Sequence, residues 1–136
     1  MCAIVAGAEA GCVVAQNAGA MAAVSLGQLA TNAGSLLVFP KAHAETLLDT
    51  SDSALGDCIA LAKRVAGALQ ATLACPGITL RQNNGPASGQ DVWHLHVHVV
   101  PRWPDDRFGR DAPVPMPEPE RAVLASRIRA GLVDGL

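Results

Sequence analysis

The chain has 136 residues, half of them hydrophobic, and a formal net charge of −2 with histidine counted as neutral. This length suits one domain with one core, and the charge lacks the basic footprint of a nucleic-acid-binding protein. Residues 10–40 carry no charge, but polar side chains and glycines interrupt them, so they contain no apolar span of about 20 residues that could cross a membrane. We therefore expect a cytoplasmic protein that binds neither nucleic acid nor membrane.

The first half of the chain predicts strands followed by one long helix. Four apolar segments precede residue 40, and the last two are typical of strands. They are 2–6, 12–15, 20–26 and 35–39, with a turn at 31–34. Apolar residues then recur at helical spacing, which predicts an amphipathic helix over about 52–74.

The second half predicts two more strands and a last helix. The strands are expected at 78–80 and 91–100, separated by a loop at 83–90 that is rich in turn-forming residues. Residues 104–119 contain five prolines, which predicts irregular structure, and 120–133 predicts a helix. Since few helices alternate with strands, we expect an α+β fold. It would have an antiparallel sheet of about five strands, one main helix and a C-terminal helix.

Three of the four histidines stand at the alternate positions 94, 96 and 98. Their β-branched and apolar context predicts a strand, in which alternate side chains share one face at intervals of roughly 7 Å. We therefore expect His94, His96 and His98 to form a row, with the apolar side chains between and beside them in the core. These apolar residues are Trp93, Leu95, Val97 and Val99.

Two kinds of chemistry suit such a row, a metal site and nucleophilic catalysis. The loop just upstream favours nucleophilic catalysis on an anionic group such as phosphate, because it offers amide and hydroxyl donors and flexible glycines. These residues are Asn83, Asn84, Ser88, Gly89 and Gln90. A metal site would need carboxylates or thiolates there, and only Asp91 is near.

These motifs resemble those of the histidine-triad superfamily. His94-Leu95-His96-Val97-His98-Val99-Val100 matches its His-φ-His-φ-His-φ-φ motif, where φ is apolar, and residues 83–90 resemble its phosphate loop. Residues 2–7, residues 34–43 and Pro101-Arg102 also resemble family elements. The resemblance spans about 1–105. It implies one histidine-triad domain over 1–136, in which 104–136 is a Pro-rich segment and a C-terminal helix.

The resemblance implies a homodimer whose sheets join. It also implies a nucleotidyl hydrolase or transferase acting on nucleoside phosphoramidates, dinucleoside polyphosphates or related conjugates. By position, His96 would be the nucleophile that forms a nucleotidyl-histidine intermediate. His94 would orient it, and His98 would contact the phosphate or the leaving group. The phosphate oxygens would be held by Asn83, Gly89 and Gln90.

The chain departs from the family pattern in three places. Ser35 stands where many members have a supporting histidine, and we expect its hydroxyl to hydrogen-bond His94. Asp91 replaces a Ser or Thr near the leaving group, where a carboxylic acid would serve as general acid. Residues 25–28 lack the acidic residue that often contacts ribose. These departures favour, as a second hypothesis, a nucleotide-binding protein with little or no turnover.

Some family members hold zinc with two N-terminal cysteines, the histidine after Pro-Lys and the first triad histidine. Cys2, His43 and His94 match three of these positions. Since a closed structural zinc site has four ligands, we expect no metal and no cofactor, and we interpret His43 as an exposed loop residue. A zinc-dependent protein built on the histidine row is a third hypothesis.

Overall fold

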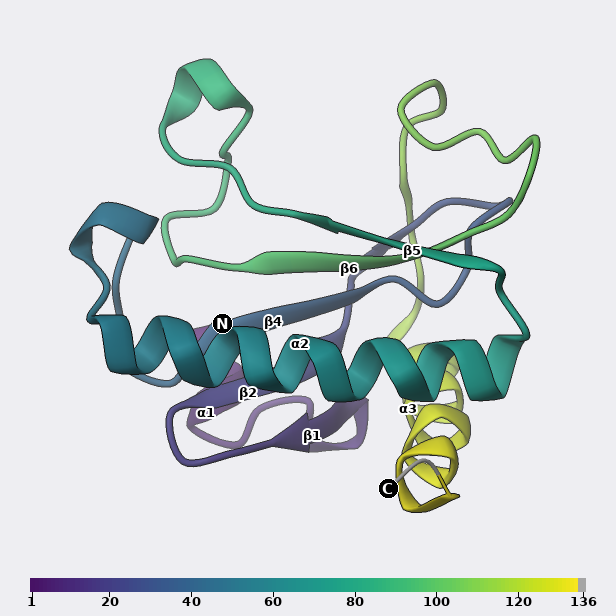
Figure 1. The fold of residues 1–136 in the computed structure, drawn as a ribbon, viewed down its shortest axis with the longest axis horizontal. Helices are drawn as coiled ribbons and strands as arrows, with labels where there is room; N and C mark the ends of the chain where they lie inside the picture. The colour runs from purple at the N-terminus through teal and green to yellow at the C-terminus, as the bar shows by residue number, and fades with distance from the viewer. Residues whose placement is uncertain (135–136) are drawn as a thin grey trace.

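The computed structural model describes the backbone of residues 1–134 and the side chains of residues 1–132. Five strands form one antiparallel sheet in the order β1-β2-β4-β6-β5. They are β1 (Val13–Gln16), β2 (Ala20–Val24), β4 (Leu36–Pro40), β5 (Gly77–Arg81) and β6 (Val97–Arg102). Helix α2 (Asp52–Leu73) runs along one face of this sheet, beside the C-terminal helix α3 (Glu118–Asp134) (Figure 1). The predicted α+β fold is therefore confirmed.

Short elements complete the fold. They are α1 (Cys2–Val5), η1 (Ala10–Cys12), β3 (Gly27–Gln28), η2 (Leu47–Asp49), η3 (Pro86–Ser88) and β7 (Val114–Pro115). The prediction that 104–119 is wholly irregular is wrong for β7, which pairs with β3. The pairing is possible despite the prolines because a neighbouring residue supplies a donor, the N–H of Met116, to the carbonyl of Leu26 at 2.8 Å.

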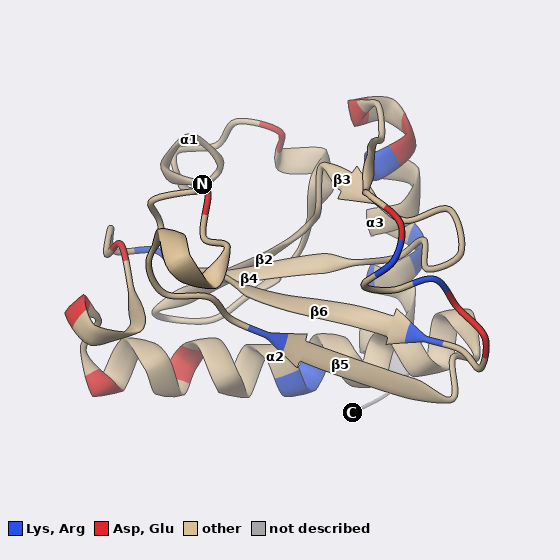
Figure 2. Cartoon of the chain, turned by 90° about the horizontal axis from the view of Figure 1, so that it is seen from above, with Lys and Arg blue, Asp and Glu red and all other residues tan. Residues whose placement is uncertain are grey.

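The predicted main helix is confirmed, and its apolar side makes the core. Ser51 caps α2 by accepting a hydrogen bond from the N–H of Ala54 at 3.2 Å, and the helix ends before Ala74, which adopts a left-handed conformation. Buried side chains of α2 pack on those of β2, β4 and β6. A smaller cluster on the opposite face packs against α1, and Figure 2 shows α1 on the side of the sheet away from α2. No helix among the described residues is long and apolar enough to span a membrane.

The predicted strand 91–100 differs most from the structure. Strand β6 begins only at Val97, which pairs with Val38 of β4. Continued in the same register, the ladder would set Leu95 opposite Pro40, which has no N–H to donate. Upstream of β6 the chain bends, and the N–H of Leu95 donates instead to the carbonyl of Ala44 at 2.7 Å. Two of the three triad histidines therefore precede the strand.

This bend also overturns one core prediction. Trp93 does not pack in the core, because the chain at this point has left the sheet, and 46% of its surface is exposed. The other three apolar residues of the motif are buried as predicted, and two of them, Val97 and Val99, contact the α2 core.

A substitution at Gly34, in the turn before β4, would test how closely this turn packs against α2. Its φ is +125°, and an added Cβ would lie 2.5 Å from Cδ1 of Leu73. We expect Gly34→Ala to lower the free energy of unfolding by about 1–3 kcal/mol, because strain and overpacking add. Gly67→Ala is the matched control, since Gly67 lies in α2 with open space around it. The control should stabilise by about 0.5–1 kcal/mol. Urea unfolding measures both, and equal stability of the two variants would contradict the packing argument.

Candidate active site

The three histidines do not form a simple row. His96 and His98 line one pocket, with ring centres 4.9 Å apart. His94 is buried behind them, against the ring of Phe39 at a centroid distance of 5.8 Å. The alternate spacing therefore places two imidazoles toward the pocket, while the bend turns the first one toward the N-terminal helix.

Hydrogen bonds fix the tautomers of His94 and His96. Nδ1 of His96 lies 2.8 Å from the carbonyl oxygen of His94. A carbonyl only accepts, so Nδ1 carries the proton and Nε2 of the neutral ring keeps its lone pair. In the same way, Nε2 of His94 donates to the carbonyl of Pro40 at 2.8 Å. His96 therefore presents an unprotonated nitrogen that is oriented from behind.

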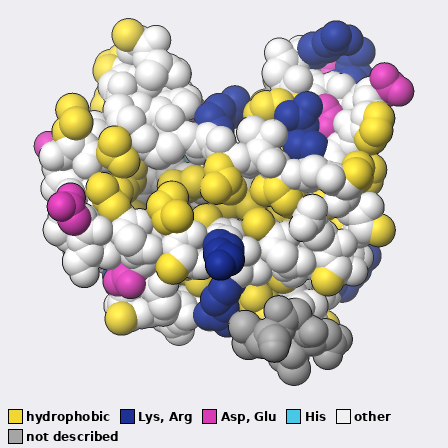
Figure 3. Space-filling view, viewed as in Figure 1, with side chains coloured by type: hydrophobic (Ala, Val, Ile, Leu, Met, Phe, Trp, Pro, Cys, Tyr) yellow, Lys and Arg dark blue, Asp and Glu magenta, His cyan; other side chains and the backbone are white. Residues whose placement is uncertain are grey.

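The pocket that His96 and His98 share has a volume of about 470 Å³, within the range of small-molecule sites. The apolar part of its lining consists of Leu26, Leu29, Leu37, Val100 and Pro113. The polar part consists of the two histidines together with Ser35, Arg81 and Asp91. Figure 3 shows the surface hollowed between the two projecting loops whose residues line this pocket. Such a pocket suits a ligand with a flat apolar part and an anionic part.

The predicted phosphate loop lies beside the pocket, and its hydrogen-bond donors differ in whether they are already used within the protein. Both amide hydrogens of Gln90 are already donated, to the carbonyls of Glu45 at 2.7 Å and Val92 at 3.0 Å. The carbonyl oxygen of Gln90 accepts from the N–H of Gly85 at 2.7 Å. This buried amide therefore braces the loop from inside, and both of its N–H groups are engaged in doing so.

Gly89 and Asn83 also differ in whether their N–H donors are already used within the loop. The N–H of Gly89 donates to the carbonyl of Pro86 at 3.0 Å. Its φ of +89° shows that the position requires glycine for conformation. The side-chain amide of Asn83 has no hydrogen-bond partner among the described residues, and Nδ2 would lie 3.4 Å from a Cβ added at Gly89. Asn83 is thus the loop side chain that remains available to an anion.

The expected hydrogen bond between Ser35 and His94 is not formed. The Ser35 hydroxyl donates weakly to the carbonyl of Asn32 at 3.5 Å, because Ser35 lines the pocket while His94 lies behind it. His94 is supported instead by the carbonyl of Pro40.

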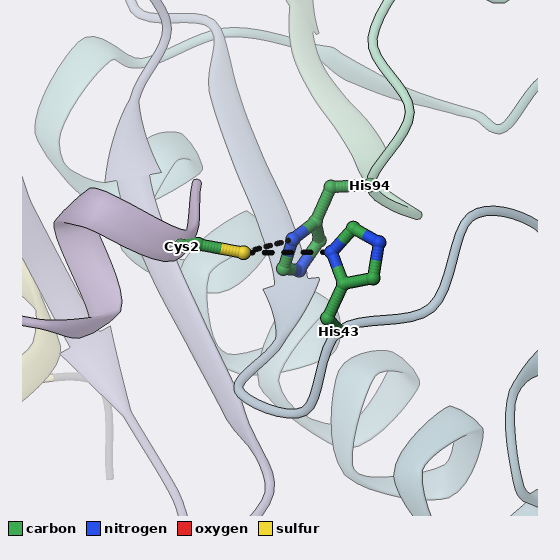
Figure 4. Close-up of side chains that lie close together, drawn as sticks. All are labelled: Cys2, His43 and His94. Atoms are coloured by element: carbon green, nitrogen blue, oxygen red, sulfur yellow. Dashed lines mark hydrogen bonds between the residues drawn. The ribbon is translucent and has the colours of Figure 1, made fainter.

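Cys2, His43 and His94 converge behind the pocket (Figure 4). Sγ of Cys2 lies 3.4 Å from Nδ1 of His43 and 3.3 Å from Nδ1 of His94. A tetrahedral zinc ion would hold sulfur and nitrogen ligands about 3.6 Å apart, given its usual bond lengths. His43 is exposed, as predicted, but it belongs to this cluster. One thiol and two imidazoles at these distances fit zinc, with the bond from His94 to Pro40 as outer support.

Among the pocket residues that the sequence analysis did not single out, three are charged or aromatic: Arg81, Phe108 and Asp111. Arg81 directly follows the predicted strand 78–80 and is the last residue of β5. Phe108 and Asp111 come from the Pro-rich segment, which the pairing of β7 with β3 brings back over the pocket. No local pattern in that segment predicts this return.

The environment of His98 generates a pH-dependent prediction. Burial is the main cause that lowers its pKa to about 4; the charges of His96 and Arg81 add to the shift and Asp91 opposes it. The unfolded chain binds a proton there near pH 6.5, so the stabilisation from neutral His98 is complete above that pH. It is lost as the pH falls toward 4.

We therefore expect His98→Gln to lose less stability than the unmodified protein between pH 7.5 and pH 5. The urea midpoints of both proteins at the two pH values measure these losses of stability. Comparing the two losses removes the contribution of all groups that titrate in both proteins. Equal losses would show that His98 ionises normally.

Comparison with known proteins agrees with this geometry. The family model named HIT domain matches residues 13–105. An uncharacterised HIT-like protein of Mycobacterium tuberculosis is 35% identical over 100 residues, which are 74% of this chain and 68% of that protein. Adenosine 5'-monophosphoramidase of Schizosaccharomyces pombe is 34% identical over 79 residues, 58% of this chain and 56% of that enzyme.

A similar solved structure is that of a zinc-bound histidine triad family protein from Mycobacterium smegmatis. It has a TM-score of 0.80 and 30% identity, and the match covers 98% of this chain and 91% of that one. The chain therefore belongs to the HIT, or histidine-triad, family.

Proposed function

We propose that this protein cleaves nucleotide conjugates by transferring a nucleoside monophosphate group to His96 and then to water. The observation that carries the proposal is the hydrogen bond from Nδ1 of His96 to the carbonyl of His94. It leaves the Nε2 lone pair available in a pocket whose lining has both an apolar and a polar part. A neutral, oriented imidazole is a competent nucleophile toward phosphorus.

The reaction has two displacement steps. In the first, the Nε2–P bond forms and the bond from phosphorus to the leaving group breaks, with both electrons going to the leaving group. In the second, the oxygen of water bonds to phosphorus, the Nε2–P bond breaks, and the water proton passes to solvent. The first step needs a proton for an amine leaving group, and we assign its delivery to Asp91, which lines the pocket.

The remaining roles follow from position. Neutral His98, beside His96, donates to the transferring group or the leaving group, and the free amide of Asn83 donates to a phosphate oxygen. The apolar part of the pocket lining receives the base. The likeness to an adenosine 5'-monophosphoramidase supports this reaction class.

Zinc has a separate place in the proposal. Cys2, His43 and His94 would hold the ion, which would supply a structural link between α1 and the triad. Through His94 it would steady the carbonyl that orients His96.

We expect His96→Ala to abolish turnover while the protein stays folded and still binds AMP. Rapid quenching of the unmodified protein should trap a nucleotide on His96. The substrate is adenosine 5'-phosphoramidate, and intact-mass spectrometry detects the adduct. Binding of AMP without any turnover by the unmodified protein would favour a nucleotide-binding protein, and turnover by His96→Ala would remove the nucleophile assignment.

We also propose a homodimer, which the exposed edge of the sheet supports. Strand β5 ends the sheet, and among the described residues no strand pairs with its outer side. Beside it lies an almost wholly apolar groove of about 320 Å³ between α2 and β5. Ile59 of α2 and Leu80 of β5 line it with 54% and 48% of their surfaces exposed. Figure 3 shows hydrophobic side chains across this face.

We expect Ile59→Glu to produce a monomer, because a second copy would bury this side chain. Val123→Glu is the matched control, since Val123 is 64% exposed on α3, away from the edge strand. Sedimentation velocity at micromolar concentration measures both variants. A monomeric unmodified protein, or a dimeric Ile59→Glu, would contradict this interface.

A further inference from the structure

We propose that Arg81 is a specificity-determining residue that binds an anionic leaving group. The preferred substrates would then carry a phosphate or polyphosphate beyond the transferred nucleoside monophosphate. This inference rests on the proposed transfer to His96 and names the substrate class of that site.

The sheet register places Arg81 beside the reacting groups. Arg81 is the last residue of β5, where Figure 2 shows the tip of the strand in blue, and it pairs directly with His98 of β6. Directly paired residues on neighbouring antiparallel strands project to the same face. Arg81 and His98 accordingly line the same pocket as His96.

The charge of Arg81 is not compensated within the described residues. Arg102 is held by the carboxylate of Asp106 at 2.7 and 3.0 Å, and Arg107 by that of Asp111 at 2.8 Å. Arg81 has no such ion pair and no side-chain hydrogen bond to the described part of the chain. Its guanidinium therefore keeps the donor geometry that matches a phosphate in bidentate fashion.

Phe108 holds this guanidinium at the pocket wall. The guanidinium carbon of Arg81 lies 5.4 Å from the centre of the Phe108 ring, and that of Arg102 lies 4.5 Å from it. Asp106 anchors Arg102 and also accepts from the backbone N–H of Phe108 at 3.2 Å. Arg81 thus packs against a ring whose backbone is held, and such support reduces the entropy lost on binding.

Asp91 lines the same pocket and carries the charge opposite to that of Arg81. It restricts the role of Arg81 to substrates with an anionic leaving group. An amine leaving group needs a proton, which is the role assigned to Asp91. A phosphate leaving group needs none. When the P–O bond breaks, it departs with the electron pair as an anion, and Arg81 binds that charge. The two side chains therefore serve different leaving groups, and substitutions of Arg81 should affect only the anionic class.

Isothermal titration with AMP and ADP tests the inference on the unmodified protein, Arg81→Gln and Arg127→Gln. Arg127 is an exposed residue of α3 outside the pocket, so its variant loses the same charge elsewhere. We expect Arg81→Gln to weaken ADP binding at least about tenfold more than AMP binding, since a charge-assisted bidentate contact is lost. Arg127→Gln should match the unmodified protein.

Turnover gives a second readout. We expect Arg81→Gln to lower kcat/KM for diadenosine triphosphate at least about tenfold and to change that for adenosine 5'-phosphoramidate less than about threefold. Equal effects on the two nucleotides and on the two substrates would overturn the role of Arg81 and leave the transfer to His96 intact. Failure of the unmodified protein to bind either nucleotide would overturn the proposed function and this inference with it.

Discussion

The proposed chemistry depends on one backbone carbonyl, that of His94, which accepts the Nδ1 proton of His96. A regular strand could not provide this contact, because its carbonyls bond to neighbouring strands. The contact exists because β4 ends at Pro40 and the chain bends before β6 begins at Val97. The carbonyl of Pro40 then binds the ring of His94 from the other side. The orientation of His96, the proposed nucleophile, is therefore a consequence of where the pairing of β4 with β6 ends.

The loop before the triad keeps this bend in place. The buried Gln90 amide bonds to the backbone of Gly85 and Val92 within the loop and of Glu45 outside it, and thereby joins the loop to the segment after β4. Leaving such a buried amide unpaired would cost about 1–3 kcal/mol per group. These bonds hold the loop backbone, so under the proposed function an anion would meet Asn83 without the cost of first arranging that backbone.

The opposite wall of the pocket depends on Asp106. Its carboxylate accepts from Asn32 at 2.7 Å, from Arg102, and from the backbone of Trp103 and Phe108. Hydrogen bonding to Arg102 is the main cause that holds the pKa of Asp106 far below its usual range. This network fixes the segment after β6 against the turn before β4, so that Phe108 reaches the pocket and contacts Arg81.

The sequence by itself determined the α+β class, the long helix and the histidine motif of the family. Helical periodicity and strand alternation can be read locally, because the side chains that an element buries recur with the period of that element. Alternation correctly placed Leu95, Val97 and Val99 in the core, but it did not predict that His94 and His96 are buried as well. Only the tertiary structure decided which partners each polar group finds. Gln90 turned inward, Ser35 faced the pocket instead of His94, and Cys2 met His43 and His94 across more than forty residues of chain. Arg81 and Phe108 met for the same reason, since contacts between distant segments follow from how the sheet and the loops pack.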